Sequence, residues 1–177
     1  MTQLIEARKG NITPEMKEVA LQEGLEPEFI RQGVADGNIV VCRNNKHTNI
    51  APLGIGKGLK TKVNANIGTS RDIKELECEL EKLRVAEKAG ADAVMDLSTG
   101  GDVNLVRRRI MAESKVIIGT VPLYQAALET FNAGRAIFQM TADEIFDGIE
   151  KHLEDGVDFI TVHCGVTAES VKRLRTE

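Results

Sequence analysis

The sequence of 177 residues predicts an α/β fold in which parallel strands alternate with helices. Four short apolar runs recur along it, and each ends in polar residues that look placed for chemistry. Reactive groups at the carboxyl ends of such strands are typical of a (β/α)₈ TIM barrel, which has eight units over about 250 residues. Only four units are recognisable, which fits either an open α/β sheet or the front half of a barrel. We expect the chain to carry roughly the first four β/α units of a barrel. The runs are 62–70, 93–101, 116–125 and 159–165.

Residues 1–60 differ from the rest and predict a small N-terminal α+β subdomain, mainly helical, with a glycine-bearing loop. Thr13 can cap a helix, and Pro14 loses nothing at the first helical position. Proline and three glycines indicate a loop before residue 60. The expected elements are helices at 13–24 and 27–37, a strand at 38–43 and a loop at 43–60.

Residues 61–177 follow a regular pattern and predict the first half of the barrel. Apolar residues in 72–88 have helical spacing, and Thr141 with Glu144 has the spacing of a capping box. The chain ends within a helical pattern that has no stop signal, so we expect a truncated N-terminal fragment of an enzyme. The expected strands are 61–68, 91–98, 115–121 and 157–164; the helices are 72–88, 102–113, one after Tyr124 to about Asn132, 141–154, and one from Thr167.

Composition narrows the function classes. A net charge of -4 and a pI near 5.5 argue against a nucleic-acid partner. No apolar run approaches the roughly 20 residues that span a bilayer, and charges in the first ten residues argue against a signal peptide. We therefore expect a soluble, cytoplasmic protein without membrane contact. The cysteines Cys42, Cys78 and Cys164 are widely spaced, which predicts free thiols and no metal site within this chain.

Polar residues at the strand ends are the candidates for a binding site. Asn64 and Asn66 face the same way on an alternating strand, and an amide both donates and accepts hydrogen bonds. The alternative is that these amides cap a helix or satisfy buried backbone. Tyr124, the only tyrosine, can orient a ligand or be an ordinary half-buried residue.

Three histidines are available for proton chemistry. His163 ends the fourth predicted strand, where an imidazole can change its protonation state near neutral pH. His47 and His152 look like loop and helix-surface residues. Cys164 follows His163 directly, and adjacent strand residues point to opposite faces, which disfavours a Cys–His nucleophile.

Taken together, these segments resemble the phosphomethylpyrimidine synthase family of thiamine biosynthesis, the ThiC proteins. The similarity covers essentially the whole chain, and four motifs in the same order make it specific. The matching motifs are Asn64-Ala-Asn-Ile-Gly68, Met95-Asp-Leu-Ser-Thr-Gly100, Gly119-Thr-Val-Pro-Leu-Tyr-Gln125 and Gly156-Val-Asp-Phe-Ile-Thr-Val-His163.

The resemblance implies a radical S-adenosylmethionine carbon–carbon lyase on a (β/α)₈ barrel. Such an enzyme rearranges 5-aminoimidazole ribotide into 4-amino-5-hydroxymethyl-2-methylpyrimidine phosphate. It also implies a homodimer for the full-length protein. The family's substrate-binding residues fall on Asn66, Met95, Tyr124 and His163: amide, phenol and imidazole orient the substrate, and the thioether packs on its ring.

The resemblance further implies a [4Fe–4S] cluster, S-adenosylmethionine and zinc. The family's three clustered cysteines, its zinc-binding histidines and its later substrate contacts have no counterpart in this sequence, and the catalytic residues are unknown. We expect the chain to hold half of a substrate site and the isolated chain to be inactive.

Two alternatives stay open. The sister family of 5-hydroxybenzimidazole synthases, from anaerobic cobamide biosynthesis, uses the same substrate and resembles the chain nearly as well. The second alternative is a non-catalytic half-barrel that binds a nucleotide or acts as an assembly subunit. The sequences of strands 61–68 and 157–164 are typical of interior strands. In a half-barrel that works alone, these two strands would be exposed edges and would promote aggregation. The pattern therefore favours a fragment of an enzyme.

Overall fold

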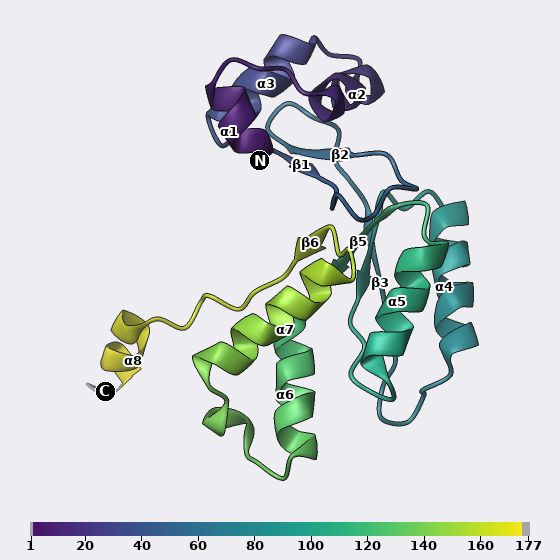
Figure 1. Ribbon diagram of the computed structural model, residues 1–177, viewed down its shortest axis with the longest axis vertical. Helices are drawn as coiled ribbons and strands as arrows, with labels where there is room; N and C mark the ends of the chain where they lie inside the picture. Colours follow the sequence, from purple (N-terminus) through teal and green to yellow (C-terminus); the bar gives the residue numbers. More distant parts are fainter. Residues whose placement is uncertain (1, 175–177) are drawn as a thin grey trace.

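The computed structural model of the chain describes residues 2–174, which form an N-terminal group of elements and a larger α/β group (Figure 1). The N-terminal group contains α1 (Gln3–Arg8), α2 (Pro14–Glu23), α3 (Pro27–Ala35), β1 (Ile39–Cys42) and β2 (Leu53–Gly56). The larger group contains β3 (Asn64–Ile67), α4 (Leu76–Lys88), β4 (Ala93–Asp96), α5 (Val103–Glu113), β5 (Ile117–Thr120), α6 (Pro122–Asn132), the 3₁₀ turn η1 (Ile137–Gln139), α7 (Ala142–Glu154), β6 (Phe159–Ile160) and α8 (Ala168–Leu174).

The N-terminal group has its own apolar interior, made by α1, α2, α3 and β1. Thr13 caps α2 as predicted: its hydroxyl accepts from the backbone N of Met16 at 3.2 Å. The helix ends at Gly24, which has a left-handed φ of 69°. β1 pairs with β2 in antiparallel register, with Val40 opposite Ile55. Whether residue 60 is a domain boundary stays a prediction.

The larger group is built on a parallel sheet in the order β3-β4-β5-β6, which confirms the predicted order and direction of the four strands. Asn66 lies opposite Met95 on the neighbouring strand, and Met95 lies opposite Gly119. The Phe159 ring of β6 packs over Gly119 of β5, and a Cβ at position 119 would lie 2.3 Å from that ring. Any other residue at 119 would therefore force the ring to move.

The two faces of the sheet have different neighbours. On one face, Val94 and Ile118 pack with α4 and α5 residues in the main apolar cluster. On the other face, Ala93 and Ile117 pack with Ile50 from the loop between β1 and β2. Because side chains alternate along a strand, Asn66 and Met95 lie on this second face, away from the helices.

Helices α6 and α7 form an antiparallel hairpin beside the sheet, and α8 lies apart at the end of an extended segment (Figure 1). Thr141 and Glu144 form the predicted capping box of α7, with the Thr141 hydroxyl 3.2 Å from the Glu144 backbone N. In residues 2–174, no helix combines the length and apolar character needed to cross a bilayer.

Several expectations were wrong in detail. The predicted loop at 43–60 contains β2, and α1 precedes the first predicted helix. Tyr124 lies inside α6 instead of before it, because Pro122 occupies the first helical turn. The strand predicted at 157–164 is only Phe159–Ile160, since it has one strand partner and its outer edge is unpaired.

Candidate functional site

Asn66 and Met95 lie opposite each other on β3 and β4, near the carboxyl ends of these strands. The Asn66 side chain is exposed, whereas Met95 is only 8% exposed. The sulfur of Met95 accepts a long contact from the Thr161 hydroxyl at 4.0 Å, so the segment after β6 reaches the end of β4. The Asn66 amide and the Met95 thioether therefore lie next to each other on one face of the sheet. A flat polar ring could bind the amide there and pack on the sulfur.

Tyr124 and His163 lie in the segments that follow the next two strands, β5 and β6. Tyr124 lies in the first turn of α6, directly after β5, and His163 lies three residues beyond β6. Their ring centroids are 5.9 Å apart with an interplanar angle of 33°, which is an aromatic contact. Both side chains are exposed at the carboxyl end of the sheet. The structure thus places Asn66 opposite Met95 and Tyr124 beside His163, and the segment after β6 carries both Thr161, which contacts Met95, and His163.

The loops after β3 and β4 are held together by short polar bonds. Asp96 is buried, and its Oδ1 accepts from the Ser98 hydroxyl at 2.5 Å. The Ser98 oxygen in turn accepts from the Thr69 backbone N at 3.1 Å. Burial raises the pKa of the Asp96 carboxyl above its usual value, although its bonds to Ser98 oppose this. Asp96 faces the helices with Val94, so it supports the loops without facing the candidate site.

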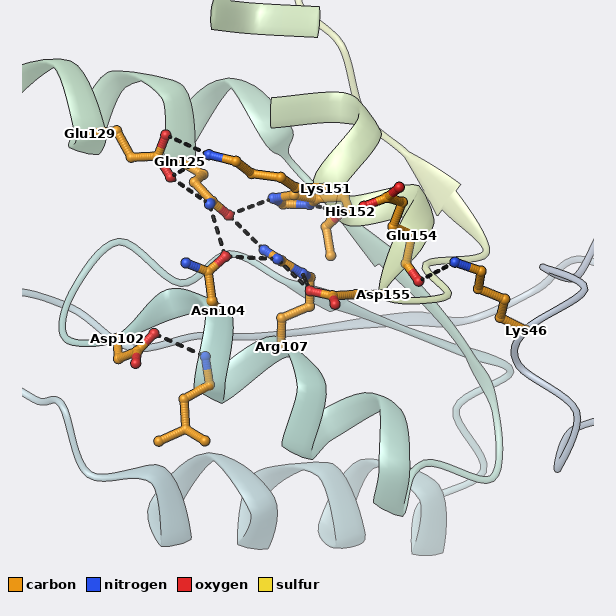
Figure 2. A network of polar contacts seen from close by, with 12 residues as sticks. Lys46, Asp102, Asn104, Arg107, Gln125, Glu129, Lys151, His152, Glu154 and Asp155 are labelled. Atoms are coloured by element: carbon orange, nitrogen blue, oxygen red, sulfur yellow. Dashed lines mark hydrogen bonds and ion pairs between the residues drawn. The ribbon is translucent and has the colours of Figure 1, made fainter. Parts of the chain in front are cut away.

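A buried network crosses helices α5, α6 and α7 behind the site (Figure 2). Arg107 donates from Nη2 to Asp155 Oδ2 at 2.6 Å and from Nη1 to Gln125 Oε1 at 2.6 Å. His152 Nε2 lies 2.8 Å from the same Gln125 oxygen, and its Nδ1 lies 2.8 Å from the Thr120 hydroxyl. Burial, with the nearby Arg107 guanidinium, lowers the pKa of His152 to about 4. The ring is therefore neutral at pH 7.

His47 and Asp158 form a second buried pair at the opposite end of the sheet. His47 Nδ1 lies 2.7 Å from Asp158 Oδ2, and the backbone N of Ile118 donates to the same oxygen at 2.8 Å. Asn44 anchors the same loop, with its backbone N donating to Asp158 Oδ1 at 2.7 Å. The loop between β1 and β2 is thereby fixed to the start of β5 and the approach to β6.

The burial of these two histidines, His47 and His152, differs from the sequence-based expectation. His47 and His152 were expected on surfaces but are only 3% and 5% exposed. For His152 a signal was present: it lies seven residues after Ile145 and three after Ile149, on the apolar stripe of α7. For His47, no pattern in its loop indicates burial, because its partner lies on a distant segment.

The described residues do not fit the metal groups that the family resemblance implies. In residues 2–174, no group of three His, Cys, Asp or Glu side chains is placed to hold a metal ion. Cys42 lies on β1, Cys78 on α4 and Cys164 beyond β6, and each is a free thiol. An iron–sulfur cluster needs converging thiolates, which these positions do not provide.

Fold and geometry together define an α/β protein whose parallel sheet presents an amide, a thioether, a phenol and an imidazole near the carboxyl ends of its strands. The sequence profile of the Radical SAM ThiC family matches residues 2–177, so the chain belongs to this family.

Curated relatives named phosphomethylpyrimidine synthase are similar to the chain along its whole length. The protein from Syntrophus aciditrophicus is 61% identical over 177 residues, which is 100% of this chain and 42% of the relative. The protein from Geobacter metallireducens is 61% identical over 99% of this chain and 41% of its own length. The protein from Pyrococcus furiosus is 52% identical over 99% of this chain and 41% of its own length. The chain thus spans about two fifths of the length of these relatives.

Proposed function

We propose that this chain supplies the N-terminal part of a phosphomethylpyrimidine synthase, with half of its substrate site. The observation that carries the proposal is the family match over residues 2–177, together with relatives of that name at 52–61% identity. The reaction proposed is the radical rearrangement of 5-aminoimidazole ribotide to 4-amino-5-hydroxymethyl-2-methylpyrimidine phosphate, in the cytoplasm.

The proposed barrel is half complete in this chain. Four parallel strands in sequence order, with helices on one face and the candidate residues Asn66 and Met95 on the other, support a (β/α)₈ barrel whose first half is residues 61–177. In this proposal the remaining strands come from the part of the enzyme that the chain does not span. That part would also provide the ligands of the [4Fe–4S] cluster and zinc, bind S-adenosylmethionine, and form a homodimer.

Each proposed substrate-binding residue has a role that its chemistry supports. The exposed Asn66 amide would donate to and accept from the polar imidazole, and Met95 would pack against the ring. Tyr124 and His163, whose rings are 5.9 Å apart, would orient the same substrate from β5 and β6. Positioning matters here because a reactive intermediate that is misaligned by about 1 Å can lose roughly 100-fold in rate.

A chimeric enzyme tests the proposal. Residues 1–177 replace the matched 42% of the Syntrophus aciditrophicus relative, and the chimera is expressed anaerobically in a bacterium that lacks its own phosphomethylpyrimidine synthase. We expect growth without added thiamine pyrimidine and the pyrimidine phosphate in extracts by mass spectrometry. The intact relative is the positive control, and its remaining C-terminal part alone is the negative control.

The product decides between the alternatives. 5-Hydroxybenzimidazole in place of the pyrimidine would assign the chain to the sister activity. A folded chimera that carries its iron–sulfur cluster but forms neither product would contradict the enzymatic proposal and favour a non-catalytic half-barrel.

A further inference from the structure

The turn that carries Tyr124 is not stabilised by a helix cap of its own. β5 ends at Thr120, Val121 is the N-cap residue of α6, and its side chain makes no capping hydrogen bond. Tyr124 lies in the first turn of the helix, and its backbone N donates to the Val121 carbonyl at 3.0 Å. Its side chain is 37% exposed, so the backbone of this turn contributes to the direction of the ring.

His152 on α7 binds both sides of this turn. Its Nδ1 is 2.8 Å from the Thr120 hydroxyl, and its Nε2 is 2.8 Å from Gln125 Oε1. A carboxamide oxygen only accepts, so Nε2 carries the proton and Nδ1 accepts from the hydroxyl of Thr120. One buried ring therefore ties the last residue of β5 to the residue that follows Tyr124.

Gln125 is itself held in a fixed direction from a third helix. Arg107 on α5 donates to the same Gln125 oxygen at 2.6 Å, and it is anchored by Asp155 at the end of α7 (Figure 2). The Gln125 amide nitrogen donates to Asn104 Oδ1 at 2.9 Å. Gln125 is only 3% exposed, so these bonds compete little with water.

We infer that His152 is a positioning residue: it clamps residues 120–125 and thereby holds the Tyr124 ring toward His163 at the mouth of the sheet. The inference rests on the proposed function only where it says that Tyr124 contacts the substrate. The clamp itself can be tested on the chain without any ligand. It gives a role to the polar network of α5, α6 and α7, whose side chains do not themselves contact the candidate site residues.

The single tyrosine makes the clamp measurable. A chain labelled with 3-fluorotyrosine has one fluorine resonance, because Tyr124 is the only tyrosine among 177 residues. We expect His152→Leu, which removes both hydrogen bonds of the imidazole, to move this resonance toward its value in the urea-unfolded chain. We expect His152→Gln, which keeps one donor and one acceptor, to retain the original resonance.

Two further variants keep the test decisive. Thr120→Val removes only the hydroxyl that donates to His152 Nδ1, and it should also move the resonance. This variant keeps the test available if His152→Leu fails to fold. Asp147→Ala replaces an exposed side chain on the same helix as His152 and should leave the resonance unchanged. The inference is overturned if the folded Thr120→Val chain keeps the original resonance, or if Asp147→Ala moves it equally.

The chimera separates this inference from the proposed function. With Tyr124 displaced, we expect His152→Leu in the chimera to raise KM for 5-aminoimidazole ribotide by roughly tenfold, with rescue by His152→Gln. A moved resonance with an unchanged KM would support the clamp and remove Tyr124 from the substrate site.

Discussion

His47 Nδ1 and Asp158 Oδ2 lie 2.7 Å apart although 111 residues separate them in the sequence. Their side chains are 2% and 0% exposed, and Asp158 also accepts from the backbone N of Ile118. This pair fixes the loop between β1 and β2 to the amino-terminal end of the sheet. The candidate site lies at the other end, so we assign the pair to stability.

Replacing Asp158 by Asn should destabilise the chain by about 2 kcal/mol, because both carboxylate oxygens meet buried nitrogen atoms and the amide NH₂ of Asn cannot accept from a backbone N–H. Urea unfolding followed by circular dichroism would measure the loss. Asp147→Asn makes the same substitution at an exposed position on α7 and serves as the control. Equal midpoints for the two variants would show that the buried pair contributes nothing.

His152 should make stability depend on pH in a defined window. Its pKa falls to about 4 because burial disfavours the imidazolium and Arg107 repels it, while Asp155 and Glu129 act in the opposite direction and Lys151 adds to the repulsion. The unfolded ring protonates near 6.5, so the folded chain binds fewer protons between these values. The contribution of the neutral His152 ring to the stability of the fold is complete above pH 6.5 and is lost as pH falls toward 4.

The measurement is the free energy of unfolding of the wild type minus that of His152→Gln, taken from pH 7 to pH 4. We expect this difference to fall by up to about 3 kcal/mol, which corresponds to a pKa near 4 in the fold against 6.5 unfolded. Lys17→Gln, an exposed substitution on α2, should run parallel to the wild type. A difference that stays flat across this range would contradict the buried neutral imidazole.

Asp96→Asn should leave the chain as stable as the wild type or make it more stable at pH 7. Burial raises the pKa of the Asp96 carboxyl, so its ionised form opposes folding above the unfolded pKa. Asn keeps an oxygen that accepts from the Ser98 backbone N, 3.0 Å away in the wild type. The advantage should shrink as pH approaches 3.8, as thermal unfolding at several pH values would show. A large loss of stability at pH 7 would indicate that the charge itself is needed.

The isolated chain should bind no iron–sulfur cluster and form no 5′-deoxyadenosine from S-adenosylmethionine. Its three cysteines lie on separate elements, and within residues 2–174 no three His, Cys, Asp or Glu side chains are placed to hold a metal ion. Anaerobic reconstitution with iron and sulfide, followed by absorbance and a cleavage assay, checks this. A stable cluster with cleavage activity would overturn the assignment of the radical chemistry to another part of the enzyme.

Local sequence signals were sufficient for much of the fold. Thr13 with Pro14 and Thr141 with Glu144 started helices as expected, because capping depends on residues within one turn. The order of the four parallel strands followed from the alternation of strand and helix. β2 was missed because Gly54 and Gly56 indicate a loop, whereas its pairing with β1 is a non-local contact.

The site was predictable only where its residues carry motifs. Asn66, Met95, Tyr124 and His163 were candidates from the sequence, and their substrate contacts stay a prediction. The apolar stripe of α7 indicates that His152 is buried, but its partners were not predictable: His152 meets Thr120 across 32 residues, and His47 meets Asp158 across 111. Such contacts are set by how helices pack, which no local pattern of polar residues encodes.

The affinity of the chimera for 5-aminoimidazole ribotide, with and without Asn66, tests the central claim most directly. Calorimetry should show that Asn66→Ala weakens binding by roughly tenfold, since it removes one donor and one acceptor. Asn64→Ala is the matched control, because Asn64 is an exposed asparagine on the same face of β3, one alternation further from the carboxyl end. We expect it to bind the substrate nearly as the unmodified chimera does. Unchanged affinity in Asn66→Ala, or an equal loss in both variants, would contradict the claim that this chain holds half of the substrate site.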